Sequence, residues 1–482
     1  EGYPYSRTLY ENSPLKRAIK SGLPGKEFAI TETNSHIGVY RYGVEDQSKI
    51  AGVNFVKGYY LVNLVMDSDG AKVYELKDRA GRVLAKQTDG KDEENSISNA
   101  TQQVYNPKGD LVQVLPPNYF GMTKNQADFS IHKSYNFLHQ LAQITTPDSG
   151  ATKFVYDSSG QIRFSTNSLN EAVGTIAYKK YDILGRITEE GTIPGVWGDG
   201  SEWQEIANTD PNYPSDSSWS KLNEYDGDGS DITLIGRLWK TISQSNDKKI
   251  SNDYKYDRYG NTTASTLLIE GETEQKTTYT YNNLGNVLSV NYPENAPVPS
   301  VVYTYNILGQ NTAIGTPDST DKFAKYTYNA DGSIASEVFN SRKENVIQRN
   351  LKYNSPGWIK EIMNQFSDDN PILKLGYSYT SGGYEDAKYF NGSIANAVTT
   401  NYIKPENSFD YRYKYNNVGQ LIVAAHSSNN KFNVGVTAPT TYDANGNIET
   451  ITSENETLNY TYDEGTNKVI NVSSSNEEIN RV

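Results

Sequence analysis

Tyr281-Asn282-Asn283-Leu284-Gly285 is one of four consecutive copies of a short pattern in the middle of the chain. The other copies are Tyr256-Asp257-Arg258-Tyr259-Gly260, Tyr305-Asn306-Ile307-Leu308-Gly309 and Tyr328-Asn329-Ala330-Asp331-Gly332, and successive tyrosines lie 25, 24 and 23 residues apart. A fixed period in this range is typical of a repeat architecture, in which each unit packs mainly against its neighbours. With 482 residues the chain is long for a single globular core, which also favours an array.

Each copy has the features of a β-hairpin. A second tyrosine stands two positions earlier, as in Tyr279 and Tyr281, and this spacing places both rings on one face of a strand. The following Asp or Asn, two variable residues and Gly suit a type I turn, in which the Gly takes a positive φ and forms a G1 bulge. An aliphatic residue such as Val287 then begins the return strand. Stacked hairpins of this kind predict a continuous antiparallel sheet that folds cooperatively, because one hairpin alone is marginal in water.

The same pattern continues outward with growing degeneracy. Further copies begin and end at Tyr105 and Gly109, Tyr156 and Gly160, Tyr181 and Gly185, Tyr353 and Gly357, Tyr415 and Gly419, and Tyr442 and Gly446. Two copies are damaged, since Lys77 replaces the tyrosine before Asp78 and His139 replaces the glycine after Tyr135. A third, Tyr462-Asp463-Glu464-Gly465, is expected to have a shortened turn.

Composition excludes several classes of protein. The net charge is −13 and no stripe of Lys or Arg stands out, which argues against a nucleic-acid partner. The chain has no cysteine, so disulfides and thiolate metal sites are excluded. The longest apolar stretch, residues 59–66, is far shorter than a membrane helix and predicts a buried strand. Because the chain opens at Glu1 without an initiator Met or a signal-peptide pattern, we expect a piece of a longer protein.

The tandem Tyr-Asp/Asn-x-x-Gly pattern resembles the YD-repeat, or Rhs, family of large secreted and cell-surface proteins, over roughly residues 74–470. The motifs Tyr10-Glu11-Asn12-Ser13-Pro14-Leu15, Gly22-Leu23-Pro24-Gly25-Lys26 and Leu115-Pro116-Pro117 are similar to Rhs-type proteins of Bacteroidetes. The resemblance implies an all-β fold in which tandem hairpins form one long antiparallel sheet that coils into a hollow shell.

Four regions are expected: an N-terminal β-rich region (1–73), degenerate repeats (74–186), a tryptophan-rich insertion (187–253) and regular repeats (254–482). The insertion holds Trp197, Trp203, Trp219 and Trp239, and we expect it to have a small core of its own. Residues Ser201 to Asn208 predict a short helix, and Tyr225-Asp226 resumes the repeat with a delayed return arm at Leu238.

The loop from Asp226 to Asp231 is the one candidate metal site. Asp226, Asp228 and Ser230 alternate as oxygen ligands do in calcium loops, but Gly and Glu are missing at the sixth and twelfth positions of an EF-hand. Two interpretations stay open, a structural turn and a weak calcium site, and no other cofactor is expected. Melting with and without a chelator distinguishes them, because a calcium site predicts a higher melting temperature with calcium and an unchanged temperature contradicts it.

No catalytic constellation is evident. The four histidines, His36, His132, His139 and His426, are scattered, and no nucleophile elbow, P-loop or dinucleotide motif is present. The acidic pairs Glu189/Glu190 and Asp368/Asp369 are the only basis for a glycosidase, and adjacent acids arise by chance in a chain with 58 of them. We therefore expect no enzymatic activity.

Two functions compete. In the first, the chain is a structural segment of the shell of a secreted or cell-surface bacterial protein, and the resemblance implies a C-terminal toxin or effector domain outside this chain. Its partners are the rest of its own polypeptide, including that cargo, and secretion or surface-assembly proteins. The alternative is a cell-surface adhesin or glycan-binding repeat protein, in which rows of tyrosine stack on sugars rather than only form cross-strand ladders. Raw sheet edges predict association with other chains unless the ends cap themselves.

Overall fold

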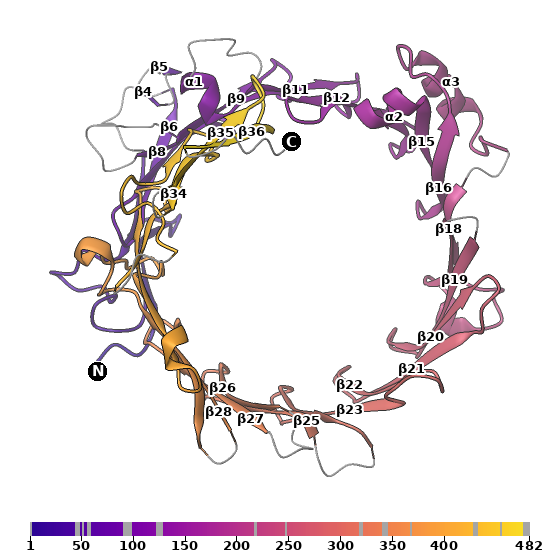
Figure 1. The fold of residues 1–482 in the computed structure, drawn as a ribbon. Coiled ribbons are helices and arrows are strands. Elements are labelled where there is room, and N and C mark those ends of the chain that lie inside the picture. The colour runs from indigo at the N-terminus through magenta and orange to yellow at the C-terminus, as the bar shows by residue number, and fades with distance from the viewer. Residues whose placement is uncertain are drawn as a thin grey trace. The chain divides into compact units, whose positions relative to one another are not determined.

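The computed structural model describes residues 2–43, 49–50, 53–54, 59–89, 99–121, 129–215, 219–245, 248–317, 322–339, 346–366, 369–427, 432–453 and 456–475. The regular secondary structure of these residues is almost entirely β-strand (Figure 1). The all-β fold expected from the repeats is confirmed, with one antiparallel sheet of 30 strands and smaller sheets of four and two strands.

The strands of the first third are β1 (Arg7–Tyr10), β2 (Ala18–Gly22), β3 (Gly38–Tyr42), β4 (Lys49–Ile50), β5 (Val53–Asn54), β6 (Leu61–Met66), β7 (Lys72–Lys77), β8 (Val83–Asp89), β9 (Asn99–Tyr105), β10 (Leu111–Leu115), β11 (Ile131–Tyr135), β12 (Leu141–Thr146), β13 (Gly150–Tyr156) and β14 (Ile162–Asn167). Those of the middle are β15 (Thr175–Tyr181), β16 (Ile187–Pro194), β17 (Trp219–Tyr225), β18 (Leu238–Ser245), β19 (Lys248–Tyr256), β20 (Thr262–Ile269), β21 (Gln275–Tyr281), β22 (Val287–Asn291), β23 (Ser300–Tyr305), β24 (Asn311–Gly315), β25 (Lys322–Tyr328) and β26 (Ile334–Phe339).

The last strands are β27 (Ile347–Tyr353), β28 (Ile359–Phe366), β29 (Pro371–Ser378), β30 (Asn396–Asn401), β31 (Phe409–Tyr415), β32 (Leu421–His426), β33 (Thr441–Tyr442), β34 (Ile448–Ser453), β35 (Glu456–Tyr462) and β36 (Val469–Ser474). The helices are α1 (Pro117–Gly121), α2 (Ser168–Val173) and α3 (Ser201–Thr209), with short 3₁₀ turns η2 (Ile232–Leu234), η3 (Tyr384–Asp386) and η4 (Pro405–Asn407).

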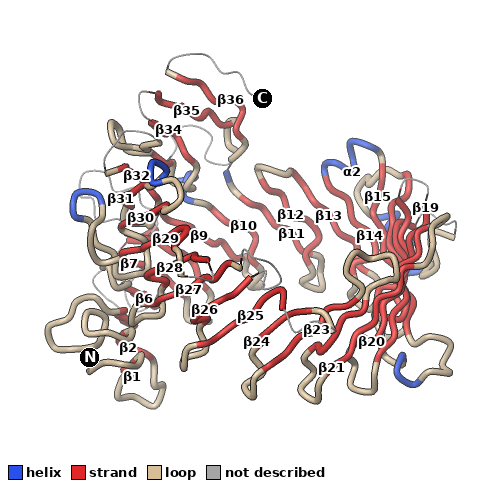
Figure 2. Tube along the Cα trace, turned by 60° about the horizontal axis from the view of Figure 1, so that its bottom comes forward, coloured by secondary structure: helices blue, strands red, loops and turns tan. Residues whose placement is uncertain are grey.

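The strands pair antiparallel with their neighbours in chain order. β1, β2, β3 and β6 to β11 form one such series, and β13 to β26 form another. β28 to β32 continue the pattern, and β33 to β36 form the four-stranded sheet. Each hairpin therefore adds two strands to the growing sheet, as Figure 2 shows for β20 to β25.

The strands end on two opposite sides of the sheet, and the two sides carry different loops. From β7 onward each odd-numbered strand runs into a Tyr-Asp/Asn-x-x-Gly turn or a variant of it, and the next strand runs away from that turn. We call the side of the sheet on which the strands end in these turns the turn edge; the term refers to strand ends and not to an outermost strand. The opposite side, where the even-numbered strands end and the longer loops lie, is the connection edge.

The chain divides into two compact units. Unit 1 contains Glu1–Lys133, Thr145–Ser149 and Arg349–Val482, so it joins the first and last parts of the chain. Unit 2 contains Ser134–Ile144 and Gly150–Gln348. The four regions expected from the sequence stay a prediction.

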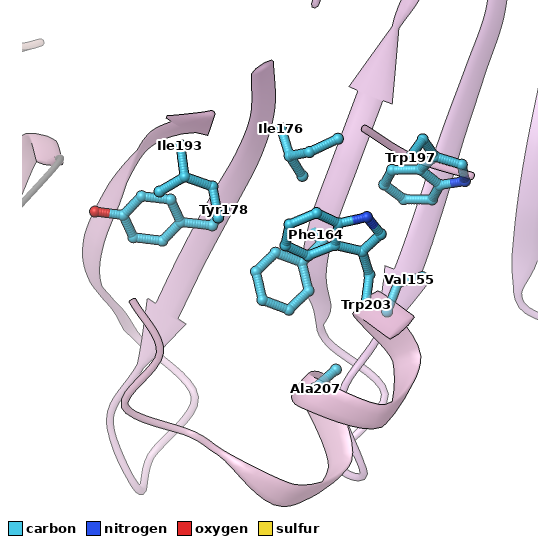
Figure 3. Close-up of a cluster of buried hydrophobic side chains, with 8 residues drawn as sticks. All are labelled: Val155, Phe164, Ile176, Tyr178, Ile193, Trp197, Trp203 and Ala207. Atoms are coloured by element: carbon cyan, nitrogen blue, oxygen red, sulfur yellow. The ribbon is translucent and has the colours of Figure 1, made fainter. Parts of the chain in front are cut away.

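The main core of unit 2 lies beneath the tryptophan-rich segment. Trp197 and Trp203 pack with strand residues of β13 to β16, among them Phe164 and Ile176, which are at most 1% exposed. Figure 3 shows these side chains gathered beside α3. The buried guanidinium of Arg163 donates to the carbonyl oxygens of Lys179 and Tyr213, which holds the following loop against the strands.

The expected helix is present as α3, but the expected separate core is wrong. Trp219 and Trp239 lie in β17 and β18, which extend the sheet, and the other two tryptophans share their core with the sheet. Tyr225 pairs with Leu238 across the long turn, as the delayed return arm predicts. In unit 1 a smaller core joins Val62, Leu64, Tyr74, Leu76, Ala85 and Ala100. The predicted strand at residues 59–66 is observed as β6, with Val62 and Leu64 buried and Leu61 and Val65 exposed.

Candidate functional site

The repeat turn is a compact hydrogen-bonded unit. In the copy at Tyr281, the N–H of Gly285 donates to the carbonyl of Asn282 at 3.1 Å, and Gly285 has φ 82°. The side chain of Asn282 accepts from the N–H groups of Leu284 and Asn286, both at 2.9 Å. The register shifts by one residue at Tyr281, which is the bulge that the pattern predicts. The acceptor and the glycine thus have separate tasks: the first organises the loop, and the second supplies a backbone conformation that a side chain disfavours.

The other repeat positions show the same backbone geometry. Positive φ angles between 79° and 95° occur at Gly160, Gly185, Gly260, Gly309, Gly332, Gly357, Gly419 and Gly446. His139 also adopts a positive φ of 62° and donates its N–H to Asn136, so it takes the place of the missing glycine. The shortened turn expected after Tyr462 is wrong: Tyr462 pairs with Val469, whereas Tyr281 pairs with Val287, so this loop is one residue longer.

The first tyrosine of each motif joins one hairpin to the previous one. The hydroxyl of Tyr281 donates to the carbonyl of Thr262 at 2.7 Å, and that of Tyr305 to the carbonyl of Val287 at 2.8 Å. In both cases the acceptor is the second residue after the glycine of the preceding repeat. The same joint is made by Tyr156, Tyr181, Tyr225, Tyr256, Tyr328, Tyr442 and Tyr462. We call it the tyrosine joint.

The tyrosine joint was not foreseen, and it reveals a missed copy of the repeat. Tyr379 donates to the carbonyl of Ile359 at 2.7 Å, and Gly382 has φ 75°. The signal was present in the pair Tyr377 and Tyr379 with a glycine three residues later, but Thr380 replaces the usual Asp or Asn.

Removing one phenol tests the joint. We expect Tyr281→Phe to lower the free energy of unfolding by about 1–2 kcal/mol, because the carbonyl of Thr262 loses its donor. The measurement is the shift of the urea midpoint at constant slope. Tyr279→Phe is the control, since in the described part of the chain its hydroxyl has no recorded acceptor and only the ring packs. Equal shifts for both variants would show that the ring, and not the hydrogen bond, joins the repeats.

The candidate calcium residues lie in the long turn after β17. Arg186 donates to both carboxylate oxygens of Asp226, at 3.2 and 2.6 Å, and the N–H of Gly236 also donates to this carboxylate. Asp228 accepts from the N–H and the hydroxyl of Ser230. No group of three or more His, Asp or Glu residues with the geometry of a metal site occurs in the described residues. The chelator experiment remains the test of this loop.

The described residues of the acidic pairs and the histidines each have their own contacts. Glu189 accepts from Tyr178 at 2.7 Å and pairs with Lys180 at 3.0 Å, while Glu190 lies 3.8 Å from Lys221. Asp368 lies outside the described residues, and Asp369 is in a turn with φ 64°. His132 bonds to Ser130 at 2.7 Å. His426 packs edge-on against Tyr411.

His36 belongs to a joint within unit 1. Its ring stacks on Phe390 with centroids 3.4 Å apart. The hydroxyl of Ser68 donates to the carbonyl of Phe390 at 2.8 Å, and the N–H of Phe390 donates to Asp69 at 2.6 Å. Phe28 meets Phe390 edge-on. Residues of the first third therefore hold both the ring and the backbone of one residue in the last third. We call this contact the Phe390 latch.

The Phe390 latch borders a cavity of about 910 Å³, which is lined in part by Asp67, Asp69, Asp386 and Lys388. Burial raises the pKa of the Asp69 carboxyl above its usual value, although hydrogen bonds from Phe390 and Asn391 act in the opposite direction. Asp69 thus takes up a proton at higher pH in the folded protein than a solvent-exposed carboxyl group does.

This shift gives a pH dependence with a definite sign. Because the pKa of Asp69 is higher in the folded than in the unfolded chain, the folded state takes up the proton first as pH falls. We expect the stability of the natural protein relative to Asp69→Asn to rise as pH falls from about 7 towards about 4. Asp226→Asn should show the opposite trend at lower pH, because the hydrogen bond from Arg186 lowers the pKa of Asp226: the natural protein should lose stability relative to this variant as pH falls below about 5. Urea unfolding of the three proteins from about pH 7 to about pH 3 is the measurement; parallel curves would contradict the expectation.

Comparison with known proteins identifies the type of repeat. Residues 230–434 match the family described as Teneurin YD-shell. Salivary gland surface protein 1 of Aedes aegypti is 24% identical over 423 residues, which are 82% of this chain and 12% of that protein. The chain is thus similar to the YD-shell family over residues 230–434, which contain regular copies of the Tyr-Asp/Asn-x-x-Gly repeat.

Solved structures show the same fold. The crystal structure of TcdB2-TccC3-Cdc42 is similar over 96% of this chain and 22% of that one, with a TM-score of 0.68 and 15% identity. TcdB2-TccC3-TEV gives a TM-score of 0.66 over 97% of this chain and 22% of that one, also at 15% identity. The Tc holotoxin pore of Photorhabdus luminescens gives 0.52 over 99% of this chain and 22% of that one, at 12% identity. The chain therefore spans about a fifth of the solved relatives and about an eighth of the curated one.

Proposed function

We propose that this chain is a wall segment of a large secreted or cell-surface YD-repeat protein, whose shell encloses or presents a toxin or effector domain that follows the repeats. The observation that carries the proposal is the 30-stranded antiparallel sheet of joined hairpins, whose fold is similar over nearly the whole chain to TcdB2-TccC3. A bacterial source, and the resemblance to Rhs-type proteins of Bacteroidetes, belong to this proposal.

The arrangement of side chains suits a wall rather than an enzyme. The polar groups of the repeats are used in the wall itself: tyrosine joints hold neighbouring hairpins together, and aspartate or asparagine side chains organise the turn within each hairpin. In the part of the chain that the structure describes, no helix has the length and apolar character needed to cross a bilayer. We infer that this segment has no catalytic activity, and that its partners are the rest of its own polypeptide and proteins of secretion or surface assembly. The comparisons do not favour the adhesin alternative.

The test uses the full-length protein. The reading frame beyond residue 482 should continue into a further domain, and a protease should cleave that domain slowly while the wall is intact. Opening the wall with Gly435→Ala, described in the Discussion, should restore rapid cleavage. A reading frame that ends soon after residue 482, or a following domain that is cleaved as fast as the same domain alone, would rule out the enclosing function.

A further inference from the structure

Unit 1 contains two layers of strands that meet edge to edge. Loops on the connection edge of early strands contact turns on the turn edge of late strands, as the residues around Gly25 and Ser68 show. A Cβ on Gly25 would lie 2.9 Å from Cβ of Ser355, and Phe28 packs edge-on against Trp358. The Phe390 latch is the second contact, between the loop after β6 and the long turn after β29.

Two further contacts follow the same rule. Asn118, just after β10, exchanges hydrogen bonds with Asn445 at 2.9 and 3.1 Å and donates to Asp443 at 2.7 Å. Asp148, just after β12, accepts from the backbone and side chain of Asn467 at 2.7 and 3.0 Å. In every case the later residue belongs to a turn and the earlier one to a connection.

The spacing of the hydrogen bonds across this joint is nearly constant. The hydrogen bonds of the Phe390 latch join residues 321 and 322 positions apart, those of Asn118 join residues 325 and 327 apart, and those of Asp148 span 319. A turn in the later layer thus forms hydrogen bonds with the connection that lies 319 to 327 residues earlier in the chain. The contacts of Gly25 with Ser355 and of Phe28 with Trp358 span 330 residues, and the rings of His36 and Phe28 reach Phe390 from 354 and 362 residues away. The offset is set by the regular advance of the hairpins, because each repeat adds a similar length of chain.

The turn edge of unit 2 carries a different set of residues. One or both of the two middle positions hold a large, mainly apolar side chain in five of its turns: Phe137 and Leu138, Ile183 and Leu184, Tyr259, Leu284, and Ile307 and Leu308. Their exposed fractions lie between 60% and 100%. These positions of a type I turn usually hold polar residues, and a row of exposed apolar side chains marks an interaction site.

The tips form a row because neighbouring turns touch. The side chain of Gln161 donates to the carbonyl of Gly185 at 2.9 Å, and that of Gln310 to the carbonyl of Gly332 at 3.5 Å. In unit 1, by contrast, the corresponding tip residues Ala444 and Asn445 are half-buried rather than exposed, because Asn118 binds there. The tips of unit 2 are thus turns of the same kind whose apolar side chains stay exposed in the described part of the chain.

We propose that the apolar turn edge of unit 2 docks onto the connection edge of a further strip of hairpins in the same polypeptide. The contacts in unit 1 show that turns of one strip meet connections of another. Their spacing along the chain indicates which residues the tips of unit 2 should contact. For every tip from Phe137 to Leu308, a position 319 to 327 residues earlier falls upstream of residue 1. The solved relatives are more than four times as long as this chain, so chains of this fold do carry such additional length. This inference concerns the wall and stands independently of any cargo domain.

The absence of cysteine makes the test clean, because one introduced thiol is the only one in the chain. Ile307→Cys places a thiol on a tip whose side chain is 98% exposed, so folding should be unaffected. Lys255→Cys is the matched control on an exposed position of strand β19. Both variants are made in this 482-residue chain and in the full-length polypeptide, and the rate of maleimide labelling is measured.

We expect Cys labelling at position 307 to be at least about tenfold slower in the full-length protein than in this chain, and labelling at 255 to be fast in both. A short bifunctional cross-linker on the 307 thiol should capture a residue 319 to 327 positions upstream. Equal labelling rates overturn the proposal. Protection in this chain that grows with its concentration also overturns it, because the occupant is then a second copy. A cross-link to a different region or to another protein overturns it as well. None of these outcomes depends on the cleavage of a downstream domain, so the two proposals fail separately.

Discussion

Gly435→Ala is expected to destabilise the C-terminal part of unit 1 by about 4 kcal/mol or more. Gly435 has φ 72°, and a Cβ built on it lies 2.0 Å from the carbonyl oxygen of Ile422 and 3.3 Å from the backbone nitrogen of Thr440. Neither atom is the end of a flexible side chain, so the backbone itself must move. That movement breaks the hydrogen bond from Thr440 to Ile422 and the one from Gly435 to Thr452.

These hydrogen bonds connect two sheets. Val434 bridges Ala424 of β32 on one side and Ser453 of β34 on the other, so residues 434 and 435 link the 30-stranded to the four-stranded sheet, beside the tyrosine joint of Tyr442. Loss of this link should loosen β33 to β36 and accelerate hydrogen exchange at the amides of Ala424 and Val434.

Gly419→Ala is the matched control. Gly419 has nearly the same backbone angle, φ 83°, but no atom of the described residues lies within 4 Å of a Cβ at this position. Only the conformational cost of about 1–2 kcal/mol is expected there. Urea unfolding of both variants measures the difference. If the two glycines cost the same, the close approach to Ile422 does not constrain the link.

Phe164→Ala is expected to cost about 3–5 kcal/mol in unit 2. Phe164 is 0% exposed and lies 5.3 Å from Trp203, ring centre to ring centre. Truncation leaves a cavity between the strands and α3, because Trp203 of α3 packs in the same cluster as this ring. Tryptophan fluorescence reports the change directly, because Trp197 and Trp203 belong to the same cluster.

Phe137→Ala is the control for the same chemical change. Phe137 is 82% exposed at a turn tip, so in this chain its truncation should alter stability by no more than about 0.5 kcal/mol. A large effect at position 137 or a small one at 164 would contradict the assignment of the core.

The local part of the fold could be predicted because its causes are local. Asn282, Gly285 and the paired tyrosines lie within seven residues, and the turn acceptor, the positive φ and the strand face each follow from residue type. The helix at Ser201 and the delayed return at Leu238 were likewise readable from the sequence.

The remaining features depend on contacts between distant residues. The joint of Tyr281 to Thr262 requires knowing how far one hairpin is displaced from the next, and the Phe390 latch joins residues more than 320 positions apart. The tryptophans suggested a separate core because they cluster in sequence, whereas their partners Phe164 and Ile176 lie in strands with no matching signal. The copy at Tyr379 was missed because Thr380 replaces the Asp or Asn by which the turn is recognised in the sequence.

The tyrosine joint also determines the order in which the wall can assemble. Apart from that of Tyr225, each of these hydroxyls binds a carbonyl only 14 to 21 residues earlier in the chain. Each hairpin can therefore attach to the preceding folded hairpin as soon as it leaves a ribosome or a secretion channel. Short loops close quickly and at small entropic cost, and folding from the N-terminal end can therefore proceed one hairpin at a time. The edge-to-edge contacts of unit 1 must wait for more than 300 further residues. We expect growth along the chain to come first and locking between layers to come last.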